Sequence, residues 1–177
     1  MLLNRVKSKR KEILEAWFVR IIETYPDDSH NFFLKKKNQF ANPVGTTIER
    51  EIAVLFDQLT GEMDDTEIAR SLGEIARIRA VQDFEPSRAM GFILELRAVI
   101  REAIKEELRG PAALDDLFEF EQRLDTLALC AFDNYMDSRE RLHQIRNREI
   151  KARSQEMVAR IYRDGAERSD NDNEEKT

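Results

Sequence analysis

The sequence predicts an all-α fold, a globin-like or irregular helical bundle of about five to six helices with a long projecting C-terminal helix. Apolar residues recur at spacings of three and four along most of the 177 residues, which is the period of amphipathic helices. The chain holds only 6 Gly and 4 Pro, and alternating runs of Val, Ile and Thr, which are typical of strands, are absent. With 41% hydrophobic residues, it can bury a core despite its high charge.

The N-terminal region predicts one helix from Leu2 to Thr24. Pro26 closes it, because the residue before a proline is disfavoured in the helical conformation. Residues 27–39 contain a short apolar run and predict a second, short helix. The buried face of the first helix consists of apolar residues at helical spacing, Ile13, Leu14, Trp17, Phe18, Ile21, Ile22 and Tyr25.

The segment FANPVG leads into the next helix. Either Asn42 caps this helix with Pro43 as its first residue, or Thr46 and Glu49 form a capping box after Gly45. We expect the glycine to adopt a backbone conformation that a β-branched residue would resist. The helix buries a stripe that ends before a terminating glycine at position 61, and this stripe comprises Ile48, Ile52, Leu55, Phe56 and Leu59.

An arginine extends the apolar stripe of the following helix. Residues 64–66 offer N-caps, and the spacing of the apolar residues reaches Arg79. A buried guanidinium must meet a carboxylate or backbone carbonyls, because an isolated buried charge is very costly. Asp83 is the candidate partner. The rest of the stripe comprises Ile68, Leu72, Ile75 and Ala76.

The next helix is expected to be central to the bundle. Pro86 suits its first position, where the missing N–H would be unpaired anyway. Residues 89–104 carry apolar side chains on nearly every side, so the helix should contact several neighbours. Gly91 indicates close approach of another backbone. A Gly-Pro pair at residues 110–111 then ends the segment.

The pattern from Leu114 onward runs for about 50 residues without a helix breaker, which predicts one long helix whose distal part projects. Its distal apolar residues would be exposed unless covered, so we expect pairing with a second copy in a homodimer or with an unidentified protein partner. Glu149 falls on the seam and limits the strength of any coiled coil. The residues expected at this interface are Leu142, Ile145, Ile150, Met157 and Ile161.

Charge and composition divide the chain into a helical domain (1–138), a basic extension helix (139–168) and an acidic, disordered tail (169–177). Residues 1–12 and 139–168 each carry a net charge of +4, and the tail carries −3; because the total is −6, residues 13–138 carry −11. This acidic surface would repel nucleic acid. Nucleic-acid binding through the basic ends is therefore the least favoured function.

The sequence predicts a cytoplasmic protein without stable membrane insertion. No apolar run approaches the roughly 20 residues of a membrane-spanning helix. The N-terminal segment MLLNRVKSKRK has charges where a signal peptide needs its apolar region. Cys130 is the single cysteine, so no intrachain disulfide is expected.

The histidine content argues against metal and haem chemistry. Residues 140–143 have the Glu-x-x-His spacing, but a di-iron bundle needs two such motifs. His30 is the only other histidine, and the expected central helix contains no proximal haem ligand. Phosphate-loop, dinucleotide and catalytic-triad motifs are not recognisable. We expect no catalytic residues, no metal and no cofactor; the alternative is a small-molecule or haem-binding globin-like sensor.

Several motifs read together resemble the N-terminal sensory domain of the RsbR co-antagonist family, of the RsbRD type. The motifs are a tryptophan in the first helix, a Tyr-Pro pair, an Asn-Pro-Val-Gly loop, and an Arg-Ala-Val-Gln signature followed by Pro-Ser. The resemblance covers Val6 to Leu108. The matching residues are candidates for ligand binding or for a structural role, and they are Trp17, Tyr25, Pro26, Asn42, Pro43, Gly45, Arg79, Gln82, Pro86 and Ser87.

The resemblance implies a helical, dimeric input module of a bacterial signalling system. Related stressosome proteins have a globin-like fold without haem, followed by a linker helix and a STAS domain that contacts a kinase. The residues after Arg139 are not strand-rich, so kinase antagonism is not carried over. The expected function is a non-enzymatic sensory or regulatory module that acts through dimerisation and protein–protein interaction.

Overall fold

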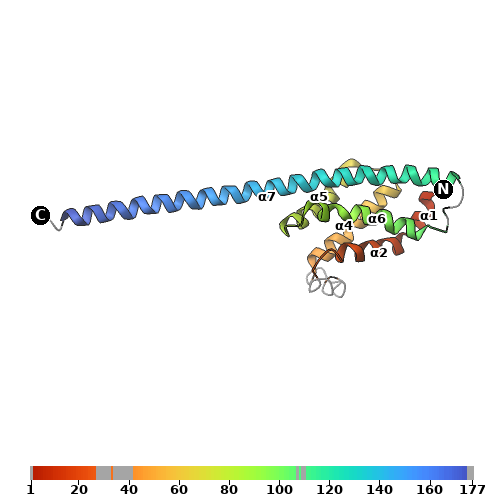
Figure 1. The fold of residues 1–177 in the computed structure, drawn as a ribbon, viewed down its shortest axis with the longest axis horizontal. Coiled ribbons are helices and arrows are strands. Elements are labelled where there is room, and N and C mark those ends of the chain that lie inside the picture. Colours follow the sequence, from red (N-terminus) through yellow and green to blue (C-terminus); the bar gives the residue numbers. More distant parts are fainter. Residues whose placement is uncertain (1, 27–32, 34–41, 107, 109–110, 175–177) are drawn as a thin grey trace. The chain divides into compact units, whose positions relative to one another are not determined.

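The computed structural model describes residues 2–26, 33, 42–106, 108 and 111–174, and no strand occurs among them. Its helices are shown in Figure 1. The prediction of an all-α fold with a long last helix is confirmed. The helices are α1 (Leu2–Ser8), α2 (Arg10–Ile22), α4 (Pro43–Thr60), α5 (Asp65–Val81), α6 (Pro86–Ala103) and α7 (Pro111–Glu174).

The chain forms two units, residues 1–139 (unit 1) and 140–177 (unit 2). Unit 1 contains α1 to α6 and the first part of α7, and unit 2 contains the rest of α7. The acidic tail was predicted to be disordered from residue 169, but α7 continues to Glu174. No proline follows residue 111, so no residue of this segment lacks the backbone N–H that a helix needs.

The core of unit 1 lies between α2, α4, α5 and α6. Helix α2 packs against α4 and α6, while α5 packs against α4 and α6 (Figure 1). Each helix contributes the apolar stripe that its sequence period predicts. Trp17 on α2 is buried, stacks on Phe92 of α6 with ring centroids 6.0 Å apart, and donates from Nε1 to the Phe92 carbonyl oxygen at 2.6 Å.

The first predicted helix is two helices. At Lys9 the backbone leaves the helical conformation, with φ −98° and ψ 15°. The side chain of Lys9 donates to the carbonyl oxygen of Ala103 at the end of α6, where a cation is favoured by the helix dipole. Neither Gly nor Pro marks this break, so the sequence pattern predicted a continuous helix. The short helix predicted over residues 27–39 lies outside the described residues, apart from Phe33.

Of the two predicted N-terminal arrangements of α4, the structure has the one in which Asn42 is the N-cap. Its Oδ1 accepts from the backbone N–H of Gly45 at 2.8 Å, and Pro43 occupies the first helical turn. A Cβ atom on Gly45 would lie 2.3 Å from Nδ2 of Asn42. The glycine is therefore needed because the capping side chain lies against it. A β-branched residue would be resisted by this contact, not by the backbone conformation that the sequence suggested.

Helix α6 contacts α2 and α5, and salt bridges join it to α7. Its starting residue is Pro86, as predicted. The expected contacts with several neighbours are therefore observed, although Leu94 is exposed. The expectation of a close backbone approach at Gly91 was wrong, because a Cβ atom there would meet nothing within 4 Å.

The first part of α7 has one buried face and one exposed apolar face. Arg123 ties this helix to the end of α4 by donating to the carbonyl oxygen of Gly61 at 3.0 Å. Arg101 of α6 pairs with Glu121 through two hydrogen bonds of 2.6 and 2.9 Å. The residues that face the core are Leu117, Phe120, Leu124, Leu127, Ala131 and Tyr135, whereas Leu114, Phe118, Leu129, Phe132 and Met136 are exposed.

The cap of α4 yields a stability prediction. Gly45→Val should lower the free energy of unfolding by about 2 kcal/mol or more, because the new side chain displaces the Asn42 cap and strains its surroundings. Pro43→Ala should cost less than about 1 kcal/mol, since it only frees the unfolded backbone. Urea denaturation of both variants measures the difference. Equal, small losses would show that the close contact between Gly45 and Asn42 is not needed.

Candidate functional site: an arginine enclosed by aromatic rings

Arg79, in the last turn of α5, is wholly buried. The apolar period of α5 directs this position inward, as predicted. Its Nη1 donates to the carbonyl oxygens of Arg88 and Ala89 at 3.0 and 3.1 Å, and its Nη2 donates to Thr24 Oγ1 at 3.2 Å. Of the two predicted arrangements, a carbonyl clamp is therefore observed. Among the described residues no carboxylate pairs with it.

The predicted partner of Arg79, Asp83, does not contact the guanidinium. Asp83 is exposed and has a φ of 59°, a left-handed conformation that aspartate tolerates better than most residues. Asp83 lies in the turn between α5 and α6, and this turn reverses the chain so that the start of α6 lies beside Arg79. The carbonyls of Arg88 and Ala89, in the first turn of α6, take the place of the predicted carboxylate.

Three aromatic rings surround the guanidinium group. The Cζ atom of Arg79 lies 5.7 Å from the ring centroid of Tyr25, 5.1 Å from that of Phe84 and 5.3 Å from that of Phe92. The faces of such rings attract cations, and more strongly where water is excluded. Arg79 with Tyr25, Phe84 and Phe92 is called the Arg79 cluster below. The rings offset part of the cost of burying a charge without a counterion.

Among the described residues, neither the hydroxyl of Tyr25 nor Nε of Arg79 makes a hydrogen bond of good geometry, although the hydroxyl and the guanidinium interact with each other. Burial raises the pKa of the Tyr25 hydroxyl, against the opposing effect of the nearby Arg79 charge. Burial also lowers the pKa of the Arg79 guanidinium. Both directions follow from low polarity, which disfavours the charged form of each group.

The Arg79 cluster joins four helices of unit 1. Thr24 follows α2, Arg79 ends α5, and the accepting carbonyls of Arg88 and Ala89 belong to the first turn of α6. From α7, the hydroxyl of Tyr135 donates to the carbonyl oxygen of Phe84. A displacement of the cluster would therefore change contacts at the end of α2, at the α5–α6 turn and on α7.

The structure links four of the predicted motif residues, Asn42, Tyr25, Arg79 and Trp17, into one chain of contacts. Asn42 donates from Nδ2 to the carbonyl oxygen of Phe33 at 3.1 Å. The Phe33 ring packs edge-on against Tyr25 with centroids 5.0 Å apart, and Tyr25 faces Arg79. On the other side of Arg79, Phe92 stacks on Trp17.

The other motif residues lie outside this chain of contacts. Pro43, Gln82 and Ser87 are exposed, and Pro86 is half-buried at the start of α6. Sequence reasoning missed three residues of the site, Phe84, Arg88 and Thr24. The only signal for them was an aromatic residue beside a predicted turn, because their contacts with Arg79 bridge separate helices.

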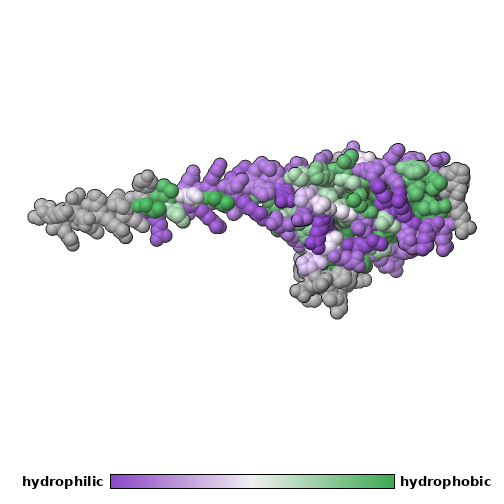
Figure 2. All heavy atoms as spheres, in the orientation of Figure 1, coloured by the Kyte–Doolittle hydropathy of each residue, from purple (hydrophilic) through white to green (hydrophobic). Residues whose placement is uncertain are grey.

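The residues expected at an interface lie in unit 2. Ile145, Ile150, Met157 and Ile161 are exposed by 50% or more, and Leu142 is half-buried. Figure 2 shows apolar side chains among the polar ones along this segment. His143 is exposed on the same segment, and His30 lies outside the described residues.

In the part of the chain that the structure describes, three or more His, Cys, Asp or Glu side chains do not gather as a metal site would require. Within the same residues, no helix has the length and apolar character needed to cross a bilayer.

The fold and the Arg79 cluster define a helical domain built around a buried structural arginine. The sequence model of the family described as "RsbT co-antagonist protein rsbRD N-terminal domain" matches residues 11–150. The chain therefore belongs to this family, which is one of regulatory signalling domains. The match reaches beyond the Leu108 limit of the sequence resemblance and includes much of α7. Neither a curated protein nor a solved structure matches the chain.

The burial of Arg79 predicts a large loss of stability on truncation. Arg79→Ala should lower the free energy of unfolding by about 3 kcal/mol, because it removes the hydrogen bonds of the guanidinium to Thr24 and to the α6 carbonyls and opens a cavity. The matched control is Arg77→Ala on the same helix, which removes only a surface pair with Glu74 and should cost less than about 0.5 kcal/mol. Urea denaturation measures both. Equal losses would contradict a structural role for the Arg79 clamp.

The Tyr25 hydroxyl predicts the opposite outcome for a smaller change. Tyr25→Phe should leave stability unchanged or raise it by up to about 1 kcal/mol, since no hydrogen bond of good geometry is lost. Tyr135→Phe, which removes the bond to Phe84, should cost about 1 kcal/mol.

Alkaline pH should widen the difference between the wild type and Tyr25→Phe. The pKa of Tyr25 is raised above its ordinary value of 10.0 in the folded protein, so the unfolded chain ionises first as pH rises. The wild type therefore loses stability above that pH, whereas Tyr25→Phe has no hydroxyl at this position and does not show this loss. Thermal denaturation of both between pH 8 and 11 measures it. A Tyr25→Phe variant less stable than Tyr135→Phe at pH 8 would contradict the assignment.

Proposed function

We propose that this protein is a non-enzymatic, cytoplasmic sensory or regulatory module that acts through dimerisation and through binding to a partner protein. Membership of the RsbRD N-terminal domain family supports a role in stressosome-type signalling. The name of the family associates such domains with a co-antagonist of RsbT. This association motivates the protein–protein interaction proposed for the present chain.

The observation that carries the proposal is the apolar surface of α7. In unit 1 the exposed fractions of Phe118, Leu129, Phe132 and Met136 lie between 42% and 69%. In unit 2 apolar residues continue at exposed positions to Ile161. Repeated exposed apolar residues on one helix mark a surface that another protein covers. A helix of this length also gains stability from packing, because its own backbone supplies little.

A second copy of the chain is the proposed occupant of this surface. Homo-oligomers are most often twofold dimers, in which the same patch pairs with itself. In unit 2 Ile150, Met157 and Ile161 lie seven and four residues apart, close to two turns and one turn of helix, so they form one stripe. Glu149 falls on the seam that continues from Leu142 and Ile145, and basic residues lie beside the stripe, which limits the strength of self-pairing. A weak pair leaves the same helix able to bind a different protein.

The Arg79 cluster offers a route from the body of unit 1 to α7. Tyr135 lies on the buried face of α7 and binds the backbone of Phe84, whose ring contacts Arg79. Met136, its neighbour in sequence, belongs to the exposed apolar face. A signal that displaces the cluster would thus change the position of the α7 face proposed for dimerisation. Such coupling requires a difference in binding between two states of the cluster.

Dimerisation is tested by light scattering on the full chain and on a truncation after Ser138. We expect a dimeric full chain because α7 otherwise leaves its apolar side chains in water. A dimeric truncation would place the interface on the unit 1 part of α7, and a monomeric one would place it in unit 2. Monomers in both samples would refute the proposal.

Point variants in the full chain localise the interface without truncation. If unit 2 pairs, Met157→Glu should weaken the dimer by about tenfold or more, because a carboxylate would be buried in an apolar contact. Gln155→Glu adds the same charge on the opposite side of the helix and is the matched control. Sedimentation velocity over a concentration series measures both dissociation constants. Equal weakening by both variants would show a general charge effect and no apolar seam.

A further inference from the structure

A cavity of about 430 Å³ lies between α2 and α4. Helix α2 lines it with residues that recur on one face, from Arg10 to Val19, and α4 lines it with one face from Asn42 to Ala53. Phe33 completes the lining. Its volume falls within the range of small-molecule sites. No residue of the Arg79 cluster and no residue of α7 lines this cavity.

The inner wall of the cavity is apolar. Leu14 and Phe18 of α2, Ile52 and Ala53 of α4, and Phe33 line it. Leu14, Phe18 and Phe33 are only half-buried although they pack against the core. Part of their apolar surface therefore borders the cavity, where an apolar ligand would release water.

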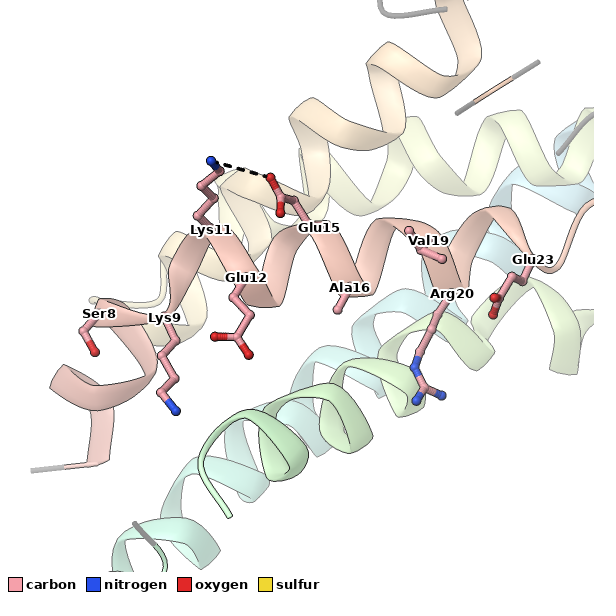
Figure 3. A pocket seen from close by; sticks show the side chains of 9 residues that line it. All are labelled: Ser8, Lys9, Lys11, Glu12, Glu15, Ala16, Val19, Arg20 and Glu23. Atoms are coloured by element: carbon pink, nitrogen blue, oxygen red, sulfur yellow. Dashed lines mark ion pairs between the residues drawn. The ribbon is translucent and has the colours of Figure 1, made fainter. Parts of the chain in front are cut away.

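The charged side chains at the rim leave no excess positive charge for an anionic ligand. Arg10 forms two hydrogen bonds of 2.8 Å with the carboxylate of Asp57. Lys11 lies 4.0 Å from Glu15 on the same side of α2, as Figure 3 shows. Glu49 also lines the rim, so its two cations and two carboxylates sum to zero. A rim without net positive charge does not favour a carboxylate or phosphate ligand.

Polar groups in the cavity lie at the first turn of α4. The hydroxyl of Thr46 donates to the carbonyl oxygen of Asn42 at 2.8 Å, which leaves its own oxygen able to accept a hydrogen bond. Apolar walls with one polar end are typical of sites that orient a small ligand.

Two other large cavities lined by described residues lack this chemistry. The groove of about 940 Å³ along α2, shown in Figure 3, is lined mainly by charged residues, with Lys9, Glu12 and Arg20 on its side of the helix. The cavity of about 620 Å³ beside the Arg79 cluster has aromatic walls but is rimmed by the charged residues Asp83, Glu85 and Arg88. The α2–α4 cavity is the one with both an apolar interior and a paired charged rim.

We propose that the α2–α4 cavity binds an uncharged, mainly apolar small molecule that carries a hydrogen-bond donor for Thr46. A ligand in this cavity contacts Phe33, and Phe33 packs on Tyr25 of the Arg79 cluster. Binding would therefore bear on the same residues that connect to α7. The inference goes beyond the proposed function, since dimerisation does not depend on it.

The test uses the full chain labelled with ¹⁵N and three uncharged probes of different shape, namely cyclohexanol, 4-methylphenol and indole, with benzoate as an anionic probe. We expect saturable shifts of the backbone amides of Leu14, Thr46 and Ala53 with at least one uncharged probe, and weaker or no binding of benzoate. Failure of all three uncharged probes to saturate these amides, or equal binding of benzoate, would overturn the proposal. The oligomeric state of the same samples reports separately on the proposed function.

A filled cavity provides the matched variant. Ala53→Leu places a larger side chain in the cavity and should raise the dissociation constant of the bound probe by about tenfold or more. Ala16→Leu adds the same atoms to the outer groove of Figure 3 and should leave binding unchanged. Thr46→Val keeps the volume and removes the hydroxyl, so it should weaken 4-methylphenol more than it weakens toluene. Unchanged binding in Ala53→Leu would overturn the assignment of the cavity, and its amide spectrum shows in the same experiment whether the variant is folded.

Discussion

The buried guanidinium of Arg79 is the constraint on which the organisation of unit 1 depends. A cation without a carboxylate partner persists in a protein interior only if other groups supply negative potential on several sides. Here two carbonyls of α6, a hydroxyl after α2 and the faces of three rings supply it. These groups must all be in place together. The ends of α2, α5 and α6 are consequently fixed relative to one another by one side chain.

Most of the rest of the core is apolar and does not depend on such exact placement, although Glu51, Thr60 and Ser71 are also buried. Isoleucine, leucine and phenylalanine side chains between α2, α4, α5 and α6 gain free energy from burial alone. The Arg79 cluster, in contrast, holds two polar atoms that make no hydrogen bond of good geometry among the described residues, and partly satisfied polar networks are costly in a low dielectric. The cluster is thus the part of the core where a modest change of contacts has the largest effect on stability.

The sequence predicted those features that depend on local period and local chemistry. The buried faces of α4 and α5, the inward position of Arg79 and the use of Pro86 at the start of α6 all follow from residue spacing. The partners of Arg79 did not follow, because the carbonyls of α6 reach it only after the turn at Asp83 reverses the chain. Gly91 and Lys9 could not be predicted correctly for the same reason. A glycine in the sequence does not show which residues lie next to it in the fold, and a helix can end where the sequence contains neither glycine nor proline.

The exposed face of α7 shows why an apolar pattern does not identify its contacts. Phe118 and Phe132 recur at helical spacing, as the residues of the core face do, yet both side chains are exposed to solvent in the single chain. The period of a helix indicates that a side chain avoids water, but it does not say whether its own domain or another protein covers it. Phe84 was missed for a related reason, because it is an ordinary apolar residue until the fold brings the three rings together.

Trp17 gives this protein an internal spectroscopic probe. It is the only tryptophan of the chain, and its indole is buried, hydrogen-bonded and stacked on the same Phe92 ring that faces Arg79. The emission of an indole depends on the polarity and mobility of its surroundings. The intrinsic tryptophan fluorescence of the unmodified chain therefore reports on the surroundings of Phe92 and so on changes in the Arg79 cluster. No label is needed, and no other indole contributes.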